Sequence, residues 1–275
     1  MNESKTPKKN YDVALDTYQE LVLAAIRFSD LSGGIATTRR TIESTKIYTR
    51  ITLSAMTINA ILPRNLVNNT NLWDFPSLAA LTRTFIEVCH RYLYLSEGGL
   101  TEDDSAFRQS LYYFHLNSEK YKLQKDSGMP QAILDVFEVE LPKARAELMT
   151  YTTYKALHKK RAEAVRSGNA CMHLTDEEVS MRFDLLSEKF AQMYRLLSTH
   201  AHGAPFATNS QSNIRGRGIE NITETTYFHL ALLVLHRYLS KAIINQANLL
   251  SLKDQASEHY QVCTQVLESW TSQTR

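Results

Sequence analysis

Most of the chain carries apolar residues at intervals of three and four positions, which is the spacing of one face of an α-helix. The clearest example begins at Asp74, a suitable N-cap residue followed by Pro76, and ends at Gly98-Gly99. Its apolar face is predicted to hold Leu78, Leu81, Phe85, Val88, Tyr92 and Leu95, and its opposite face Arg83, Glu87, His90 and Tyr94. We therefore expect a strongly amphipathic helix in this segment.

The same periodicity predicts helices along the rest of the chain. They cover residues 11–31, 37–62, 101–128, 131–166, 175–201, 222–250 and 253–271. Residues 131–166 form one long helix or two shorter ones, with Pro142 as the expected break. Thr175-x-x-Glu178 is a capping box that opens the helix ending near Ala201. The pattern predicts an all-α helical bundle of about seven to nine helices with no sheet.

Two kinds of segment fall outside this periodic pattern. Residues 1–10 are polar and basic and are predicted to form a disordered tail. Residues 65–71, which are rich in Asn, and residues 204–221, which are polar and rich in Gly, are predicted loops. Because the chain shows no internal repeat and no obvious linker, residues 11–275 are predicted to form a single helical domain.

The composition limits the class of protein. Gly (9) and Pro (6) are scarce in 275 residues, which favours helices, and the formal net charge of +2 means that nucleic acid would need a local basic patch. Cys89, Cys171 and Cys263 are widely spaced and form no C-x-x-C motif, which is typical of a reducing cytoplasm. Neither a signal peptide nor a membrane-spanning segment is visible, so we expect a cytoplasmic protein without membrane contact.

The candidate chemistry lies in residues 194–203, near the predicted end of a helix. Arg195 is followed by His200 at five residues and by His202 at seven. Seven residues of an ideal helix advance by about 700°, so Arg195 and His202 lie within about 20° of each other, with Ser198 between them. His200 lies about 140° from Arg195 unless the last turn unwinds. The geometry favours His202 and leaves His200 as the alternative.

These residue types together suit the cleavage of RNA without a metal. A histidine side chain has an ordinary pKa of about 6.5, so it can take a proton from a ribose 2′-hydroxyl or give one to a leaving 5′-oxygen. An arginine stays charged and can bind two phosphate oxygens at once. Two copies related by a dimer axis would supply both an acid and a base. In the simpler interpretation, the arginine and the histidine only stabilise the C-terminal end of a helix.

The run Tyr194-Arg195-x-Leu197-Ser198-x-x-x-His202 resembles the Y-R-x-L-S-x-x-x-H signature of an uncharacterised bacterial family. Arg83-Thr-Phe-Ile-Glu87 matches an R-x-x-x-E helix of the same family. That family looks like a branch of the HEPN superfamily (higher eukaryote and prokaryote nucleotide-binding), whose active members carry R-x4-6-H. The resemblance extends in layout over residues 40–250, and these two short motifs are its specific part.

The resemblance implies a helical bundle that forms a homodimer, with the two motifs at a shared cleft. It implies a metal-independent endoribonuclease without a cofactor, of the kind that serves in toxin–antitoxin or anti-phage systems, and hence an antitoxin or defence-system partner protein. Arg195 and His202 would be the catalytic pair, Ser198 would support them, and Tyr194 belongs to the same signature.

Four further residues are interpreted with the motif. Arg83 and Glu87 either form a surface pair or, if their face turns inward, hold Arg195 or His202 in place. Arg215 and Arg217 alternate with glycines and would form either a solvated loop or a flexible clamp on RNA phosphates.

A metal site is the weaker alternative for the histidines. His200 and His202, with His229 and His236 downstream, contain the right ligand type, but zinc sites on helices use i, i+3 or i, i+4 spacing and no carboxylate lies among them. We therefore predict no metal.

The rival to the ribonuclease is a non-catalytic helical adaptor, or a module that binds a nucleotide or a partner. Leu196, which replaces a polar residue found in many active relatives, and the low net charge favour this rival. The stripe of Arg195, Ser198 and His202 and the adjacent Arg-Gly loop favour the ribonuclease.

Overall fold

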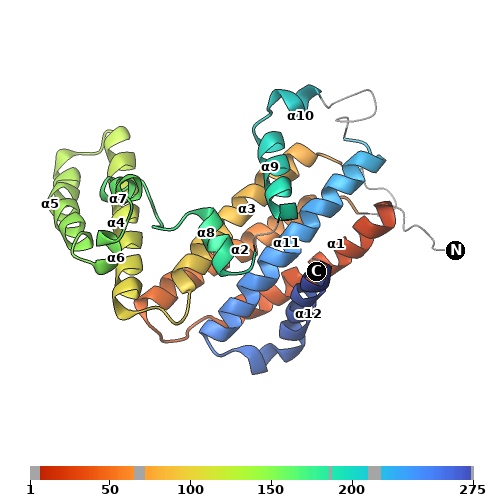
Figure 1. The fold of residues 1–275 in the computed structure, drawn as a ribbon, viewed down its shortest axis with the longest axis horizontal. Coiled ribbons are helices and arrows are strands. Elements are labelled where there is room, and N and C mark those ends of the chain that lie inside the picture. Colours follow the sequence, from red (N-terminus) through yellow and green to blue (C-terminus); the bar gives the residue numbers. More distant parts are fainter. Residues whose placement is uncertain (1–6, 65–71, 186–187, 210–217, 274–275) are drawn as a thin grey trace. The chain divides into compact units, whose positions relative to one another are not determined.

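The computed structural model describes residues 7–64, 72–185, 188–209 and 218–273, and Figure 1 shows that these ranges are built from helices. They contain twelve α-helices, one 3₁₀ helix and a single isolated bridge between Trp73 and Gly218. The elements are α1 (Pro7–Leu31), α2 (Arg39–Ile61), α3 (Phe75–Ser96), α4 (Glu102–Asp126), α5 (Gln131–Leu148), α6 (Thr152–Lys155), α7 (Lys159–Arg166), α8 (Asp176–Arg182), α9 (Glu188–Ala201), α10 (Pro205–Asn209), α11 (Ile222–Leu249), η1 (Lys253–Ala256) and α12 (Ser257–Gln273). The prediction of an all-α protein is confirmed.

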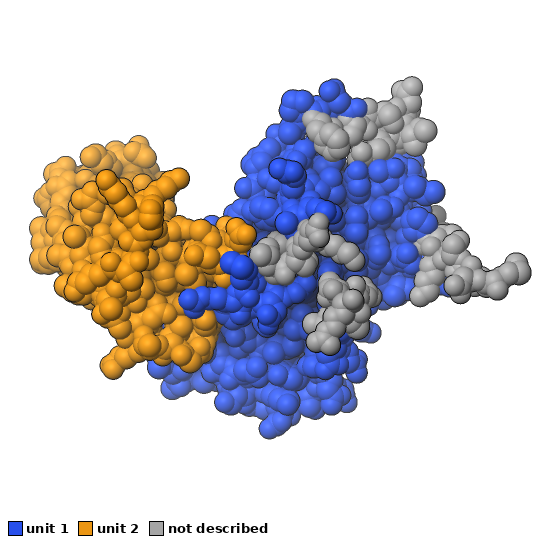
Figure 2. Space-filling model, viewed as in Figure 1, with its two compact units in different colours: residues 1–93, 180–275 blue, residues 94–179 orange. Residues whose placement is uncertain are grey.

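The chain divides into two compact units, coloured separately in Figure 2. Unit 1 comprises residues 1–93 and 180–275, and unit 2 comprises residues 94–179. The boundaries fall within α3 and within α8. The single domain over residues 11–275 stays a prediction.

The predicted tail overlaps the first helix. Helix α1 begins at Pro7, so residues 7–10 are helical and only residues 1–6 of the tail lie outside the described residues. Proline suits the first turn of a helix because the N–H that it lacks has no partner there. The Lys8 ammonium then lies 3.3 Å from the Asp12 carboxylate and 3.5 Å from that of Glu220.

Unit 1 is built around the pairing of α1 with α11, with α2 and α12 packed against both helices (Figure 1). Tyrosines contribute much of its core and also join the helices by hydrogen bonds. The hydroxyls of Tyr18 and Tyr48 donate to the carbonyls of Ala55 and Ala25, both at 3.2 Å, so each ring is buried without an unpaired polar group. These two tyrosines therefore belong to the core of unit 1.

Unit 2 has a small core of its own between α4, α5 and α7. Its buried members are Phe107, Leu111, Phe114, Leu148, Val165 and Ala170. Helix α6 is fixed to α4 by Asp103, whose carboxylate accepts hydrogen bonds from the backbone N–H groups of Thr152 at 3.2 Å and Thr153 at 3.0 Å. These backbone hydrogen bonds, that of Thr153 first, lower the pKa of Asp103.

The prediction of a break at Pro142 is wrong. Helix α5 continues through Pro142 and ends at Leu148, which is buried in the core of unit 2. A proline removes one N–H from a helix, but the surrounding turns keep their hydrogen bonds when the flanking side chains are packed. The helix ends where Leu148 enters the core and the Met149 N–H donates to the carbonyl of Arg145 at 3.2 Å.

The prediction of one helix over residues 175–201 is also wrong. The capping box forms as predicted, with the Thr175 N–H donating to the Glu178 carboxylate at 2.6 Å and the Glu178 N–H donating to the Thr175 hydroxyl at 3.1 Å. The helix nevertheless stops at Arg182, because Asp184 adopts a left-handed φ of 54° and its carbonyl accepts a hydrogen bond from Arg237. The motif therefore lies on a separate helix, α9.

The three cysteines differ in exposure. Cys89 and Cys263 are buried in unit 1, and Cys171 is half-buried in unit 2. Burial raises the pKa of the Cys89 thiol well above its ordinary value and that of Cys263 to about 12.

Candidate functional site

Helix α9 ends in a way that fixes the position of His202. The N–H of Gly203 donates to the carbonyl of His200 and the N–H of Ala204 to that of Thr199, both at 3.2 Å, which is the hydrogen-bond pattern of a Schellman motif. Gly203 supplies the left-handed residue that this motif needs, with a φ of 58°. His202 is therefore the C-cap residue and is exposed, while it stays close to the face of Arg195 and Ser198.

The imidazole of His202 contacts the guanidinium of Arg83 on α3. The contact joins Nε2 of His202 to Nη1 of Arg83, across 119 residues of sequence. A guanidinium can only donate hydrogen bonds, so Nε2 is the acceptor and the ring proton of the neutral imidazole resides on Nδ1. The two short motifs found in the sequence thus meet in space.

Arg83 is in turn held by two neighbours. Its Nε lies 3.3 Å from the Glu87 carboxylate, and its guanidinium carbon lies 5.9 Å from the centre of the Tyr194 ring. The hydrogen bond to Tyr194, followed by the charges of Tyr194 and Glu87, raises the pKa of Arg83 against the effect of desolvation. The side chains of Arg83 and Glu87 are 25% and 30% exposed, so this group lies at the surface and can meet a ligand.

The other two residues of the predicted polar face of α3 are buried. His90 and Tyr94 are each 2% exposed. In unit 1, Nε2 of His90 lies 2.9 Å from the hydroxyls of both Tyr238 and Ser180. Helix α3 is therefore buried over more of its circumference than its amphipathic pattern predicts, and only Arg83 and Glu87 of that face stay accessible.

Arg195 is exposed on α9, and Ser198 is half-buried beside it. The Arg195 carbonyl accepts a hydrogen bond from the Thr199 hydroxyl at 2.8 Å, while within the described residues its guanidinium forms no ion pair. A charged group in this setting can bind an anion from solution without first breaking an internal bond.

His200 lies on the other side of α9, in the interior of unit 1. It is 3% exposed, and its ring stands edge-on to Phe75 at 4.9 Å and to Tyr227 at 5.8 Å. A buried imidazole between aromatic rings cannot reach a substrate phosphate. Between the two histidines of the motif, the geometry favours His202.

Two predicted residues lie outside the described residues, namely Arg215 and Arg217. The described chain resumes at Gly218, whose carbonyl accepts a hydrogen bond from the Trp73 N–H at 3.1 Å, just before α3 begins.

The histidines considered as metal ligands do not form a common site. Nε2 of His236 is 2.8 Å from the carbonyl of Ala14 on α1, and burial lowers the pKa of His236 to about 4. Across the ranges that the structure describes, no three His, Cys, Asp or Glu side chains form a group that could hold a metal ion.

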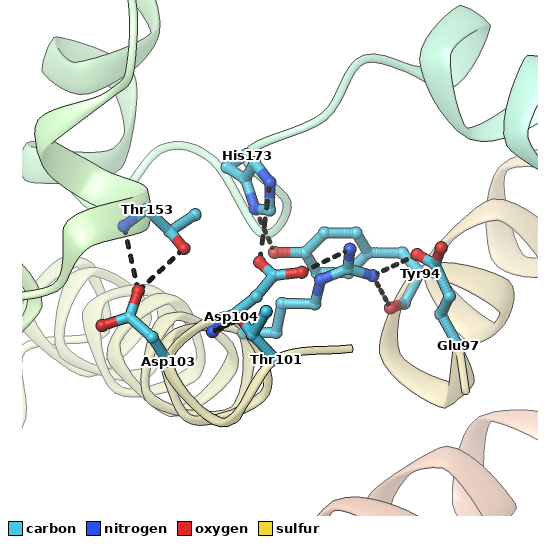
Figure 3. Close-up of polar contacts among 8 residues, drawn as sticks. Tyr94, Glu97, Thr101, Asp103, Asp104, Thr153 and His173 are labelled. Carbon is cyan, nitrogen blue, oxygen red and sulfur yellow. Dashed lines mark hydrogen bonds and ion pairs between the residues drawn. The ribbon is translucent and has the colours of Figure 1, made fainter. Parts of the chain in front are cut away.

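The sequence interpretation missed a charged cluster in unit 2, shown in Figure 3. Arg108 is fully buried, and its guanidinium lies 2.7 Å from Glu97 and 2.9 Å from Asp104. It also donates to the carbonyl of Tyr94 at 2.6 Å, while the Tyr94 hydroxyl lies 2.8 Å from Nδ1 of His173. Burial raises the pKa of Tyr94 beyond its ordinary range. The cluster is closed to substrates, so we assign it to the stability of unit 2.

Comparison with protein-family models, with curated proteins and with solved structures finds no match for this chain. The resemblance to the HEPN superfamily therefore rests on the two short motifs alone.

In the part of the chain that the structure describes, no helix combines the length and the apolar character needed to cross a membrane.

Proposed function

We propose that this protein is a metal-independent endoribonuclease of the HEPN type, in which Arg195 binds the scissile phosphate and His202 transfers protons. The observation that carries the proposal is the contact between His202 and Arg83. The contact joins His202 with Arg83 and its neighbouring carboxylate, Glu87, at the surface of unit 1. Arg195 is exposed on the same helix as the Arg83 neighbour Tyr194. Charged donors beside a proton-transfer group are what phosphodiester cleavage needs.

In the proposed reaction, Nε2 of His202 takes the proton of the ribose 2′-hydroxyl. The 2′-oxygen then bonds to phosphorus, and the bond from phosphorus to the 5′-oxygen breaks. The histidine of a second copy gives a proton to that 5′-oxygen, so the products are a 2′,3′-cyclic phosphate and a 5′-hydroxyl. Arg195 binds the non-bridging oxygens, whose charge grows in the transition state.

Arg83 has a place in this scheme because it contacts the same Nε2 that must accept the proton. An RNA phosphate is a stronger acceptor than a neutral imidazole, since hydrogen bonds between charged groups are about twice as strong as neutral ones. Binding of the phosphate would draw the Arg83 guanidinium away from His202 and free the lone pair. The free enzyme would then hold its base in a resting contact.

The direct test is cleavage of single-stranded RNA by the purified protein in excess EDTA. Removal of a general acid-base group costs on the order of 10²- to 10⁴-fold, and removal of a donor that stabilises transition-state charge about 10²- to 10³-fold, so His202→Ala and Arg195→Ala should each lower the rate at least about 100-fold. Arg50→Ala on α2 and His259→Ala on α12 change the same residue types elsewhere in unit 1 and should leave the rate unchanged. RNA with a 2′-deoxyribose at the cleaved position should resist cleavage. Equal activity of wild type and His202→Ala would refute the role of His202.

The dimer is tested by mixing wild type with a variant. If one cleft takes a histidine from each copy, an excess of His202→Ala should lower the activity of wild type further than simple dilution does, because each mixed dimer keeps only one of the two histidines. No effect of the added variant, together with a monomeric mass in sedimentation, would exclude a shared cleft. A toxin or anti-phage role predicts that wild type, and neither variant, slows the growth of cells and fragments their RNA.

The contact between Arg83 and His202 also favours the rival, a module that binds a nucleotide or a partner without cleaving it, because the lone pair of Nε2 is engaged. Under that reading RNA or nucleotide binds, Arg195→Ala weakens the binding, and no product with a cyclic phosphate forms under any condition.

A further inference from the structure

A groove of about 590 Å³ lies in unit 1 between α1, α11 and α12, three helices that Figure 1 shows close together. Its volume falls in the range of pockets that bind small molecules, about 300–1,000 Å³. None of its lining residues belongs to the proposed ribonuclease site. Each helix contributes side chains three, four and seven positions apart, so the groove runs along one continuous face of each.

The walls of the groove are largely apolar. Val13 of α1, Leu233 of α11 and Val262 and Val266 of α12 line it together with the indole of Trp270. Val13 is 58% exposed, although it lies on a helix whose neighbouring apolar residues are buried. A ligand with an apolar body would remove this side chain from water, at a gain of roughly 25 cal/mol for each Å² of apolar surface covered.

Two neutral imidazoles lie in the groove. The Ala14 carbonyl can only accept, so Nε2 of His236 is the donor in the contact at 2.8 Å, and Nδ1 keeps its lone pair. Burial lowers the pKa of His236 to about 4 and also lowers that of His229. Both rings are therefore uncharged near neutral pH and can accept a hydrogen bond from a ligand.

One charged residue lines the groove, and the guanidinium of Arg237, outside the lining, lies 5.3 Å from the centre of the Trp270 ring. Glu20 is the single Asp, Glu, Lys or Arg among the residues that line it, and no lysine or arginine is present to bind a phosphate or a carboxylate. A groove of this kind attracts a cation that can place its charge at the carboxylate and its N–H groups at neutral acceptors.

We infer that this groove binds a small organic cation, an ammonium group on an aryl or alkyl body. The ammonium pairs with Glu20, and the apolar body lies against Val13, Val266 and Trp270. The ligand class is opposite in charge to RNA, so the groove is a second site that does not depend on the proposed nuclease activity.

The test compares two fluorescent probes that share one aromatic group and differ in charge, namely dansylcadaverine, a cation, and dansyl-aminohexanoate, an anion. The cation should bind at least about tenfold more tightly than the anion. Glu20→Gln should weaken binding of the cation roughly three- to tenfold and leave the anion unaffected. Asp16→Asn, an exposed carboxylate of the same helix that does not line the groove, is the matched control.

A blocking variant separates the groove from the rest of the surface. Val13→Trp should fill it and abolish binding of the cation, while Val136→Trp, at a position of α5 that is 61% exposed, should not. Circular dichroism checks that both variants fold. Equal affinity for the two probes, or unchanged binding in Val13→Trp, would overturn the inference, and RNA cleavage by the same samples reports on the other site separately.

Discussion

In unit 2 Arg108 is fully enclosed, donates to Glu97 and a backbone carbonyl and forms an ion pair with Asp104, whereas in unit 1 Arg83 and Arg195 stay at the surface. Arg83 is shared between a carboxylate and a neutral histidine, and Arg195 is exposed to solvent. A guanidinium enclosed beside two carboxylates is out of reach of a ligand and its charge is already balanced, whereas one that contacts a neutral ring at the surface can exchange that partner for a phosphate. The burial of an arginine and the charge of its neighbours together separate a stabilising role from a binding role.

The same contrast appears in the charge of the two units. Unit 2 contains eleven Lys and Arg against fourteen Asp and Glu, a formal net charge of −3, and unit 1 contains twenty against fifteen, a net charge of +5. The value of +2 for the whole chain hides this difference. Attraction of a polyanion is thus expected of unit 1, which carries the proposed site.

The comparison is tested most strongly by Arg108→Met. Removal of the guanidinium leaves Glu97 and Asp104 without their cation, and breaking a buried ion pair on one side costs about 3–5 kcal/mol of stability. Arg166→Met, which removes the exposed pair with Glu163, should change the stability little. Urea unfolding followed by circular dichroism measures both values. A cost below about 1 kcal/mol for Arg108→Met would mean that the cluster does not stabilise unit 2.

Unit 1 buries the neutral His236, whereas unit 2 buries the charged Arg108. The buried neutral histidine makes the stability of unit 1 sensitive to acid. The pKa of His236 is lowered from 6.5 to about 4 in the folded protein, so the unfolded chain binds the proton more readily between these values. The contribution of the neutral His236 to the free energy of unfolding is fully present above pH 6.5. It is lost as the pH falls toward 4, by about 3 kcal/mol in total.

The measurement is the urea midpoint at pH 7 and pH 4.5. His236→Gln should lose most of the difference between the two midpoints, whereas His259→Gln on α12 should keep it. The same dependence in wild type and in His236→Gln would place the acid sensitivity in other groups.

Helices in both units end at a glycine with positive φ, and the space around the glycine differs. In unit 2 a Cβ on Gly168 (φ 74°) would lie 2.5 Å from the Ser118 hydroxyl and 2.7 Å from its Cβ, while one on Gly203 in unit 1 (φ 58°) would meet nothing within 4 Å. Gly203→Ala should therefore cost only the left-handed conformation, about 1 kcal/mol. Gly168→Ala should cost about 2 kcal/mol more, because Ser118 must move.

Gly128→Ala is the control for Gly168→Ala within unit 2, since its φ of 68° is similar and its surroundings are empty. Thermal or urea unfolding ranks the three variants. Equal costs for Gly168→Ala and Gly128→Ala would show that the contact with Ser118 relaxes freely.

The last prediction concerns activity in place of stability and uses Arg83→Gln. This variant removes a phosphate-binding charge but leaves Arg195 and His202 in place, so cleavage should fall about tenfold, or about 1.4 kcal/mol. Arg91→Gln changes a residue of the same helix whose guanidinium lies 4.0 Å from Glu87 and should have little effect. Single-turnover rates at saturating RNA separate this loss from a loss of affinity. An increase in rate would instead mean that the Arg83 contact mainly restrains His202.

Much of the helical layout follows from periodicity and caps. The bounds of α2, α3 and α4 agree with the predicted segments to within a few residues, because Thr38 and Thr101 cap helices whose apolar faces meet a core. The positions where helices are interrupted could not be predicted from the sequence, because they depend on tertiary contacts. The turn after α8 needs a left-handed Asp184 and a hydrogen bond from Arg237, which lies 53 residues downstream.

The two sites differ in the same way. The stripe on α9 was visible because Arg195, Ser198 and His202 share one helical face. The role of Arg108 was not visible in the sequence, because Asp104 and Arg108 in an i, i+4 arrangement are typical of a solvated helix surface. The burial of Arg108 depends on Tyr94 and Glu97 at the end of the preceding helix.

The three thiols differ in how easily a reagent reaches them, so their modification reports how often unit 1 opens. Cys171 is half-exposed in unit 2, while Cys89 and Cys263 are enclosed in unit 1 and resist ionisation. A thiol reagent should therefore modify one cysteine quickly in the native protein and the other two only as often as unit 1 opens. The count of modified cysteines over time, read by mass spectrometry, would give the opening frequency of unit 1 without any engineered cysteine.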